Sequence, residues 1–107
     1  MHKLNIKALS VNQAWKGKRF KTDAYKAYER SILIMLPKLS IPQGKLCVSL
    51  SFGLSSKNAD VDNPVKCFID CLQKKYGFND RNIYELSVTK TDVKKGNEFI
   101  DFEILSI

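Results

Sequence analysis

The strongest constraint on the fold is an alternation of apolar with small or polar side chains in the middle of the chain. Residues 46–54 read LCVSLSFGL, in which every second residue is a large apolar one: Leu46, Val48, Leu50, Phe52 and Leu54. This period of two is typical of a β-strand that buries one face and exposes the other. Pro42 and Gly44 mark a loop before it. We therefore expect a fold that contains a sheet, with residues 46–54 as its clearest strand.

Two segments, one on each side of this strand, have helical spacing instead. The first begins after Thr22, a good N-cap, and ends at Pro37, and its apolar residues recur every three to four positions: Tyr25, Tyr28, Ile32 and Met35. The second segment covers residues 64–75. Its apolar residues follow the helical spacing i, i+3, i+4, i+7 and predict the buried face: Val65, Phe68, Ile69 and Leu72. This helix is expected to begin with Asn63 as its N-cap and Pro64 as its first helical residue, and to end at Gly77.

Three further segments alternate as strands do: residues 3–8, residues 84–88 and residues 100–104. The sequence KKGN at 94–97 predicts a turn between the last two. The order of elements is then β-α-β-α-β-β. We expect residues 1–107 to form one α+β domain, an α/β sandwich of two helices packed on a small mixed four-stranded sheet.

Composition excludes several classes of protein. Hydrophobic residues make up 44% and charged residues 27% of the chain, as in an ordinary globular domain. No apolar run reaches the length of a membrane span, and the first residues lack a signal-peptide core, so we expect a cytoplasmic protein. Three cysteines do not suggest a disulfide framework. Cys67 and Cys71 could share a metal ion, but with His2 far away in sequence we favour buried thiols.

The charge is strongly positive. Eighteen Lys and Arg residues oppose eleven Asp and Glu residues, which gives a net charge of +7. Part of the excess falls in two clusters: Lys16, Lys18, Arg19 and Lys21, and then Lys90, Lys94 and Lys95. Such clusters favour a polyanionic partner, above all nucleic acid, although a solubilising surface would also explain them.

The segment KNADVDNPVK, residues 57–66, places carboxylates just before the second helix. In the simpler interpretation Asp62 or Asn63 caps the helix and Lys66 faces solvent. In the other, Asp60 and Asp62 point to the same side of an extended loop and bind Mg²⁺, while Lys66 approaches a bound phosphate. Asp80, in the loop after the helix, is a third carboxylate that only the fold can bring to this place. The spacing alone leaves both interpretations open.

A longer pattern adds to this motif. Asp60 to Lys66 read D-x-D-N-x-x-K, Asp70 to Leu72 read D-x-L, and Asn79-Asp80 precede a polar-to-aliphatic step. This run resembles the signature of the RusA family of Holliday junction resolvases. Ser10 and Asn12 are similar to the Ser-x-Asn loop of that family, and the order of elements also matches.

The resemblance implies a homodimeric, bacterial or bacteriophage-type endodeoxyribonuclease that serves DNA recombination and repair. It would resolve four-way junctions by paired symmetric nicks, with Mg²⁺ as cofactor and Mn²⁺ able to substitute. By position, Asp60, Asp62 and Asp80 would bind the metal, and Lys66 would be the essential basic residue. Two departures are Asn79, where many members have an acidic residue, and Leu9, where a proline often stands.

The remaining expectations concern DNA contacts and the helix surface. We expect phosphate contacts from the basic clusters and from the Ser-x-Asn loop: Asn12, Lys16, Lys18, Arg19, Lys21, Lys90, Lys94 and Lys95. Asp70, four residues after Lys66, suggests a surface ion pair on the helix face opposite the apolar stripe. The alternative function is a non-catalytic nucleic-acid-binding module on the same scaffold, which would have no use for three carboxylates.

Overall fold

The computed structural model describes residues 1–10, 14–16 and 20–107. Its main sheet has four strands in the order β1-β6-β4-β5. Their bounds are β1 (His2–Leu4), β4 (Leu46–Leu54), β5 (Ile83–Asp92) and β6 (Phe99–Ser106). β4 lies parallel to β5 and antiparallel to β6, and β1 pairs antiparallel with the outer side of β6. The predicted mixed four-stranded sheet is confirmed.

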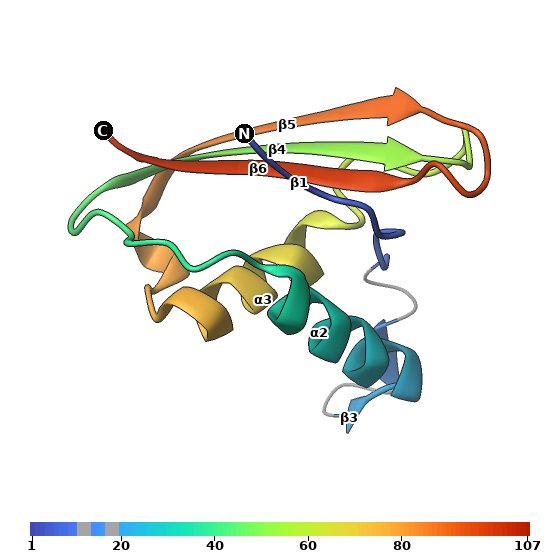
Figure 1. Cartoon of the computed structure of the whole chain (residues 1–107), viewed down its shortest axis with the longest axis horizontal. Coiled ribbons are helices and arrows are strands. Elements are labelled where there is room, and N and C mark those ends of the chain that lie inside the picture. Colours follow the sequence, from blue (N-terminus) through green and yellow to red (C-terminus); the bar gives the residue numbers. More distant parts are fainter. Residues whose placement is uncertain (11–13, 17–19) are drawn as a thin grey trace.

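Two helices, α2 (Asp23–Met35) and α3 (Val65–Tyr76), pack on one face of this sheet, and in the described residues no helix covers the opposite face (Figure 1). The predicted α+β class is therefore confirmed. A small hairpin, β2 (Trp15–Lys16) with β3 (Phe20–Lys21), lies where the sequence predicted only a basic loop. In the described part of the chain, neither helix combines the length and the apolar character that a membrane span needs.

The core lies between the helices and the face of the sheet that β4 presents to them. The alternating residues of β4 are all buried there, and Phe52 is fully enclosed. The ring of Phe52 packs edge-on against Phe68 of α3, with centroids 6.2 Å apart. Phe102 of β6 makes a similar contact with Phe68 at 5.7 Å. The stripe predicted for α3 thus meets the stripe predicted for β4.

α2 begins and ends close to its predicted bounds. The Thr22 hydroxyl accepts a hydrogen bond from the Tyr25 amide at 3.1 Å, so the predicted N-cap is confirmed. Tyr25, Tyr28 and Ile32 are buried as expected, but Met35 is exposed. The helix ends at Met35, and Leu36, extended before Pro37, is the residue that enters the core.

The start of α3 differs from the prediction. Its N-cap is Pro64, which has no capping side-chain hydrogen bond, so neither Asp62 nor Asn63 caps the helix. Instead the chain enters through two overlapping backbone turns, in which Asp60 O accepts from Asn63 N and Asp62 O accepts from Val65 N. The aspartates contribute carbonyl groups to these turns, which leaves their carboxylates unexplained by capping. At the other end, Gly77 adopts φ 75° and terminates the helix as predicted.

Two strand predictions also need correction. The strand expected at residues 3–8 ends at Leu4, where the Ile6 amide donates to the Leu4 carbonyl in a tight turn. In β5 the alternation of Tyr84 and Leu86 suggested burial, but their exposed fractions are 63% and 46%. β5 is the edge strand of the sheet, and a register shift opposite Leu46 and Cys47 alters its alternation. Tyr84 and Leu86 are therefore exposed because β5 lies at the edge of the sheet, although their apolar alternation predicted burial.

Candidate active site

A pocket of about 470 Å³ opens between the N-terminal half of α3 and the edge strand β5. Three charged residues line it: Asp62, Lys66 and Asp80. The rest of its wall is apolar: Val61, Val65, Ile69, Ile83, Leu86 and Val88. The fold therefore brings one carboxylate from before α3 and one from after it to the same side of the sheet as the Lys66 ammonium.

Lys66 lies between two carboxylates. Its Nζ is 3.1 Å from Asp70 Oδ1, four residues along α3, and 3.4 Å from Asp80 Oδ2. The hydrogen bond to Asp70 is the main cause of a raised pKa for Lys66, and Asp80 adds to it. The side chain is 59% exposed, so a cation remains within reach of a ligand that enters the pocket.

Asp80 reaches the pocket because the chain reverses after α3. Gly77 ends the helix, and the short 3₁₀ helix η1 (Asp80–Asn82) leads into β5. The Asn79 side chain caps η1 by accepting from the Arg81 amide at 3.0 Å. The Asp80 amide donates to Gln73 Oε1 at 2.8 Å, which fixes this turn against α3.

The two aspartates of the loop before α3 are placed differently. Both are exposed, but only Asp62 is among the residues that line the pocket. Asp60 lies two residues earlier, in the turn that leads to Asn63. Lys90 of β5 donates to the neighbouring Ala59 carbonyl at 2.8 Å and ties this loop to the sheet. Of the four residues in the sequence motif, the pocket thus contains three.

The magnesium site implied by the resemblance can be compared with the carboxylates at this pocket. No three His, Cys, Asp or Glu side chains in residues 1–10, 14–16 and 20–107 gather closely enough to hold a metal ion. The complete three-aspartate set that the resemblance implies is therefore not assembled. Mg²⁺ commonly takes one or two protein carboxylates and completes its shell with water and substrate phosphate. Asp62 and Asp80, which line one pocket, are two carboxylates of the kind that such a site uses.

Cys67 and Cys71 do not contribute to the pocket. Both thiols are free and buried, as the sequence analysis favoured. Burial raises the pKa of Cys67 to about 11 and that of Cys71 to about 12. Because the thiolate is the form that binds metal ions and attacks electrophiles, these thiols are structural at neutral pH.

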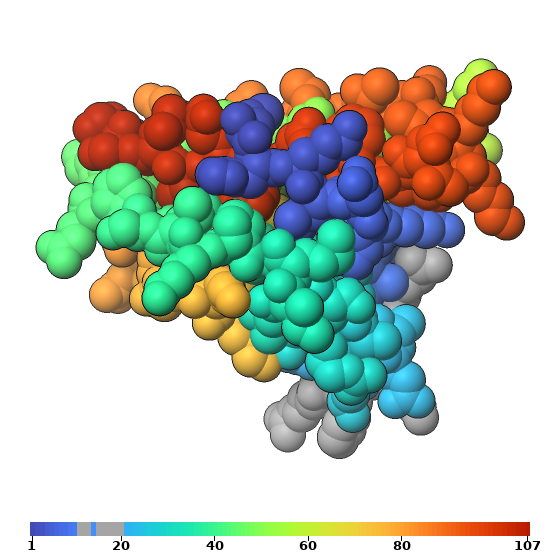
Figure 2. Space-filling model, in the orientation of Figure 1, coloured from blue at the N-terminus to red at the C-terminus, as the bar shows by residue number. Residues whose placement is uncertain are grey.

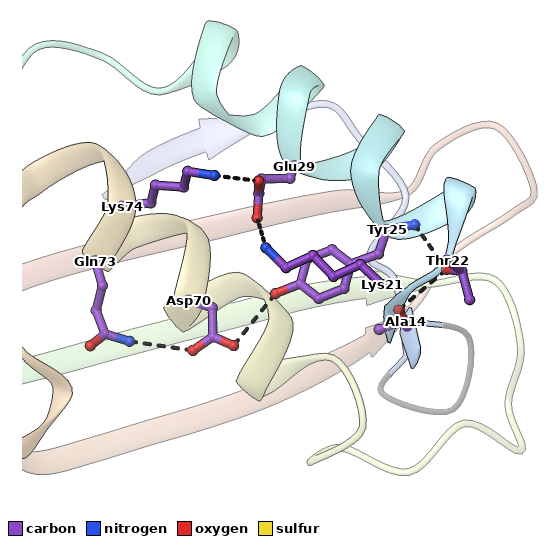
Figure 3. Close-up of polar contacts among 8 residues, drawn as sticks. All are labelled: Ala14, Lys21, Thr22, Tyr25, Glu29, Asp70, Gln73 and Lys74. Carbon is purple, nitrogen blue, oxygen red and sulfur yellow. Dashed lines mark hydrogen bonds and ion pairs between the residues drawn. The ribbon is translucent and has the colours of Figure 1, made fainter. Parts of the chain in front are cut away.

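Asp70 is less exposed than the sequence predicted. The expected ion pair with Lys66 is present, but Asp70 Oδ2 also accepts from the buried Tyr25 hydroxyl of α2 at 3.4 Å. Its Oδ1 accepts from Gln73 Nε2 at 3.3 Å, and Figure 3 shows both contacts. The i, i+4 spacing was visible in the sequence, whereas the Tyr25 contact depends on how α2 packs on α3 and has no local signal.

A second ion-pair cluster joins the hairpin to the two helices. Glu29 accepts from Lys21 at 3.0 Å and from Lys74 at 2.7 Å (Figure 3). Burial alone would raise the pKa of Glu29, but the hydrogen bonds from the two lysines outweigh it and the pKa is lowered. The Lys21 ammonium also lies 4.9 Å from the centroid of the Tyr25 ring. Lys21, expected to contact DNA, thus has intramolecular partners.

The other expected DNA contacts fall at separate places on the surface. Lys94 and Lys95 are exposed in the β5–β6 turn, which Figure 2 shows projecting in orange-red at one end of the sheet. The β2–β3 hairpin, to which the Lys16 backbone belongs, lies beside α2 at a distance from that turn (Figure 1). Asn12, Lys18 and Arg19 lie outside the described residues.

Known protein families and curated protein sequences were both compared with this chain, and neither comparison gives a match. Function must therefore be inferred from the motif and from the geometry of the pocket.

Proposed function

We propose that this chain is a Mg²⁺-dependent endodeoxyribonuclease that cuts branched DNA, with the four-way junction as its substrate. The observation that carries the proposal is the pocket in which Asp62, Lys66 and Asp80 meet. A helix cap, the simpler explanation of the D-x-D motif, does not account for these aspartates, because α3 has no side-chain cap. The resemblance to the RusA family supplies the junction as the expected substrate.

In this proposal each charged residue has a separate task. Asp62 and Asp80 hold the metal ion, and Mn²⁺ can replace Mg²⁺. Bound metal would supply a water of lowered pKa and would stabilise charge on the phosphate oxygens. Lys66 neutralises charge on the phosphate as bonds to phosphorus change, which is the role of fixed cations in phosphoryl transfer. Asp60, named by the resemblance as a third ligand, would have to join them from outside the pocket.

The protein around the pocket holds the DNA. A net charge of +7 favours any polyanion, and the exposed Lys94 and Lys95 provide phosphate contacts at one end of the sheet. Such contacts carry no base information, which suits an enzyme that recognises the shape of its substrate. The apolar wall of the pocket does not contribute to this attraction.

A homodimer is part of the proposal, since resolution of a junction requires two symmetric nicks and each chain carries one set of Asp62, Lys66 and Asp80. For the contact between copies we favour the outer edge of β5. This edge strand has ten residues, leaves its outer backbone groups without a neighbouring strand, and exposes Tyr84 and Leu86. Antiparallel pairing of the same strand across a two-fold axis is self-complementary.

The alternative is a DNA-binding module without catalysis. Such a module would bind DNA through the same basic residues, but carboxylates that repel phosphate would have no function in it. The test is incubation of the protein with a synthetic four-way junction and with a linear duplex of equal length, each with and without Mg²⁺. We expect paired nicks in the junction with Mg²⁺ only. Tight binding of the junction without nicks in either metal condition would favour the alternative.

A further inference from the structure

Two side chains of α3 that do not line the pocket contact residues that do, one at a charged group and the other at the backbone. Asp70 Oδ1 is 3.1 Å from Lys66 Nζ, and Gln73 Oε1 is 2.8 Å from the Asp80 amide. Neither Asp70 nor Gln73 is among the residues that line the pocket. Both are partly buried, and because the pocket lining includes Lys66 and Asp80 but not these two, a ligand in the pocket would meet Lys66 and Asp80 first.

Gln73 links the two halves of the arrangement. Its side-chain amide donates from Nε2 to Asp70 Oδ1 at 3.3 Å and accepts at Oε1 from the Asp80 amide. Both ends of the amide group are therefore occupied, which restricts its rotation. The backbone at Asp80 and the carboxylate of Asp70 are consequently held at fixed positions relative to each other, and Lys66 contacts both side chains.

Asp70 is in turn fixed from the core. Its Oδ2 accepts from the hydroxyl of Tyr25, a residue of α2 whose exposed fraction is 1%. Burial, and after it the charge of Asp70, raises the pKa of Tyr25 far above its usual value, so that Tyr25 remains a donor. One oxygen of Asp70 is thus bound to the core, and the other is directed at Lys66 and Gln73.

We propose that Asp70 and Gln73 are positioning residues, which hold the Lys66 ammonium and the Asp80 carboxylate against each other at the pocket. That Asp70 and Gln73 restrict the motion of Lys66 and Asp80 is independent of any activity. That this restriction assists DNA cleavage rests on the proposed function. A simple surface ion pair between Lys66 and Asp70 would instead affect only the stability of α3.

The first test measures the order of lysine ammonium groups by ¹⁵N relaxation. The variant is Asp70→Asn, and the matched control is Glu29→Gln, which removes a carboxylate of α2 that pairs at 2.7 Å with Lys74, near the C-terminal end of α3. We expect Asp70→Asn to lower the order of Lys66 and to leave Lys74 unchanged, and Glu29→Gln to do the reverse. An unchanged Lys66 signal in Asp70→Asn would overturn the proposal.

The second test concerns Gln73 and uses amide hydrogen exchange. Gln73→Met keeps the length of the side chain but removes the acceptor for the Asp80 amide, and Gln73→Glu retains that acceptor. The Asp80 amide should exchange faster in Gln73→Met and remain protected in Gln73→Glu. Amides of β4 report whether each variant is folded. Equal protection of Asp80 in Gln73→Met and wild type, with β4 intact, would contradict the role of Gln73.

Cleavage kinetics separate this inference from the proposed function. Loss of a partner that orients a functional group typically costs about 10- to 100-fold in activity. We expect Asp70→Asn to lower kcat for junction cleavage by about that factor while its junction affinity is unchanged. A variant with a disordered Lys66 and a wild-type kcat would overturn the positioning role. If wild type cuts no DNA, the proposed function fails, and the relaxation and exchange results still decide whether the two residues hold Lys66 and Asp80.

Discussion

At the scale of single residues, the sequence predicted the identity of the charged groups better than their partners. The D-x-D-N-x-x-K motif pointed to Asp62 and Lys66, and the longer pattern pointed to Asp80; all three line the pocket. It did not predict that Lys66 is paired with both Asp70 and Asp80, because the second contact requires the reversal after Gly77. It also placed Asp60 beside Asp62, whereas the turns before α3 leave Asp60 outside the pocket.

A prediction about Asp60 follows from this difference. Asp60→Asn should lower the rate of junction cleavage less than Asp62→Asn does, because only Asp62 lines the pocket. Single-turnover cleavage at saturating Mg²⁺, measured for both variants, gives the comparison. An equal loss in the two variants would mean that the complete set of three aspartates acts together.

At the scale of elements, the segments with strong periodicity and a core neighbour were predicted well. The predicted face of β4 is buried, and so are Phe68, Ile69 and Leu72 of the stripe predicted for α3, because the two apolar faces pack on each other; Val65, at the start of the stripe, is only partly buried. The hairpin β2–β3 was missed, since strands of two residues give no periodic signal. β5 was predicted as a strand but with the wrong exposure, because its place at the sheet edge is a property of the topology alone.

The cap of α2 gives a prediction at this scale. Thr22→Ala removes the acceptor for the Tyr25 amide and should lower the free energy of unfolding by about 1 kcal/mol. Chemical denaturation measures the loss. Thr22→Ser, which keeps a hydroxyl at the same position, is the matched control and should retain most of the stability of the wild type. A Thr22→Ala protein as stable as wild type would mean that the hydroxyl is not the cap.

The Glu29 cluster predicts a pH dependence. The folded-state pKa of Glu29 is lowered from its ordinary value of 4.5, so its contribution to stability is present above pH 4.5 and is lost as pH falls through the folded-state pKa. Glu29→Gln should therefore be less stable than wild type at pH 7, and the difference should shrink below pH 4.5. Thermal unfolding over this pH range tests the sign. A difference that grows on acidification would contradict the assignment.

At the scale of the whole molecule, the α+β class could be predicted from the order of elements, while the exposed edge could not. The sheet order β1-β6-β4-β5 leaves β5 with one neighbour, and this puts the pocket beside an unpaired strand edge. Two copies joined along that edge would carry their pockets on the same side of one continuous sheet. The sequence of β5 alone does not indicate that this strand lies at the sheet edge beside the pocket.

The proposed dimer predicts a mass of twice 12.2 kDa in sedimentation equilibrium at micromolar concentration. Leu86→Lys, at an exposed position of β5, should shift the protein toward monomer by placing a charge in the contact. Leu105→Lys serves as the control, because Leu105 is similarly exposed but lies on β6, which β4 separates from β5. A wild-type monomer that still makes paired nicks would exclude the dimer as the source of symmetry.

The central claim is that the pocket of Asp62, Lys66 and Asp80 cuts DNA with Mg²⁺. The most direct measurement is junction cleavage by Asp62→Asn beside Glu103→Gln, which removes a 40% exposed carboxylate of β6, away from both the pocket and β5. We predict that Asp62→Asn binds the junction at least as tightly as wild type but does not nick it, and that Glu103→Gln cleaves normally. Wild-type cleavage by Asp62→Asn would contradict the account.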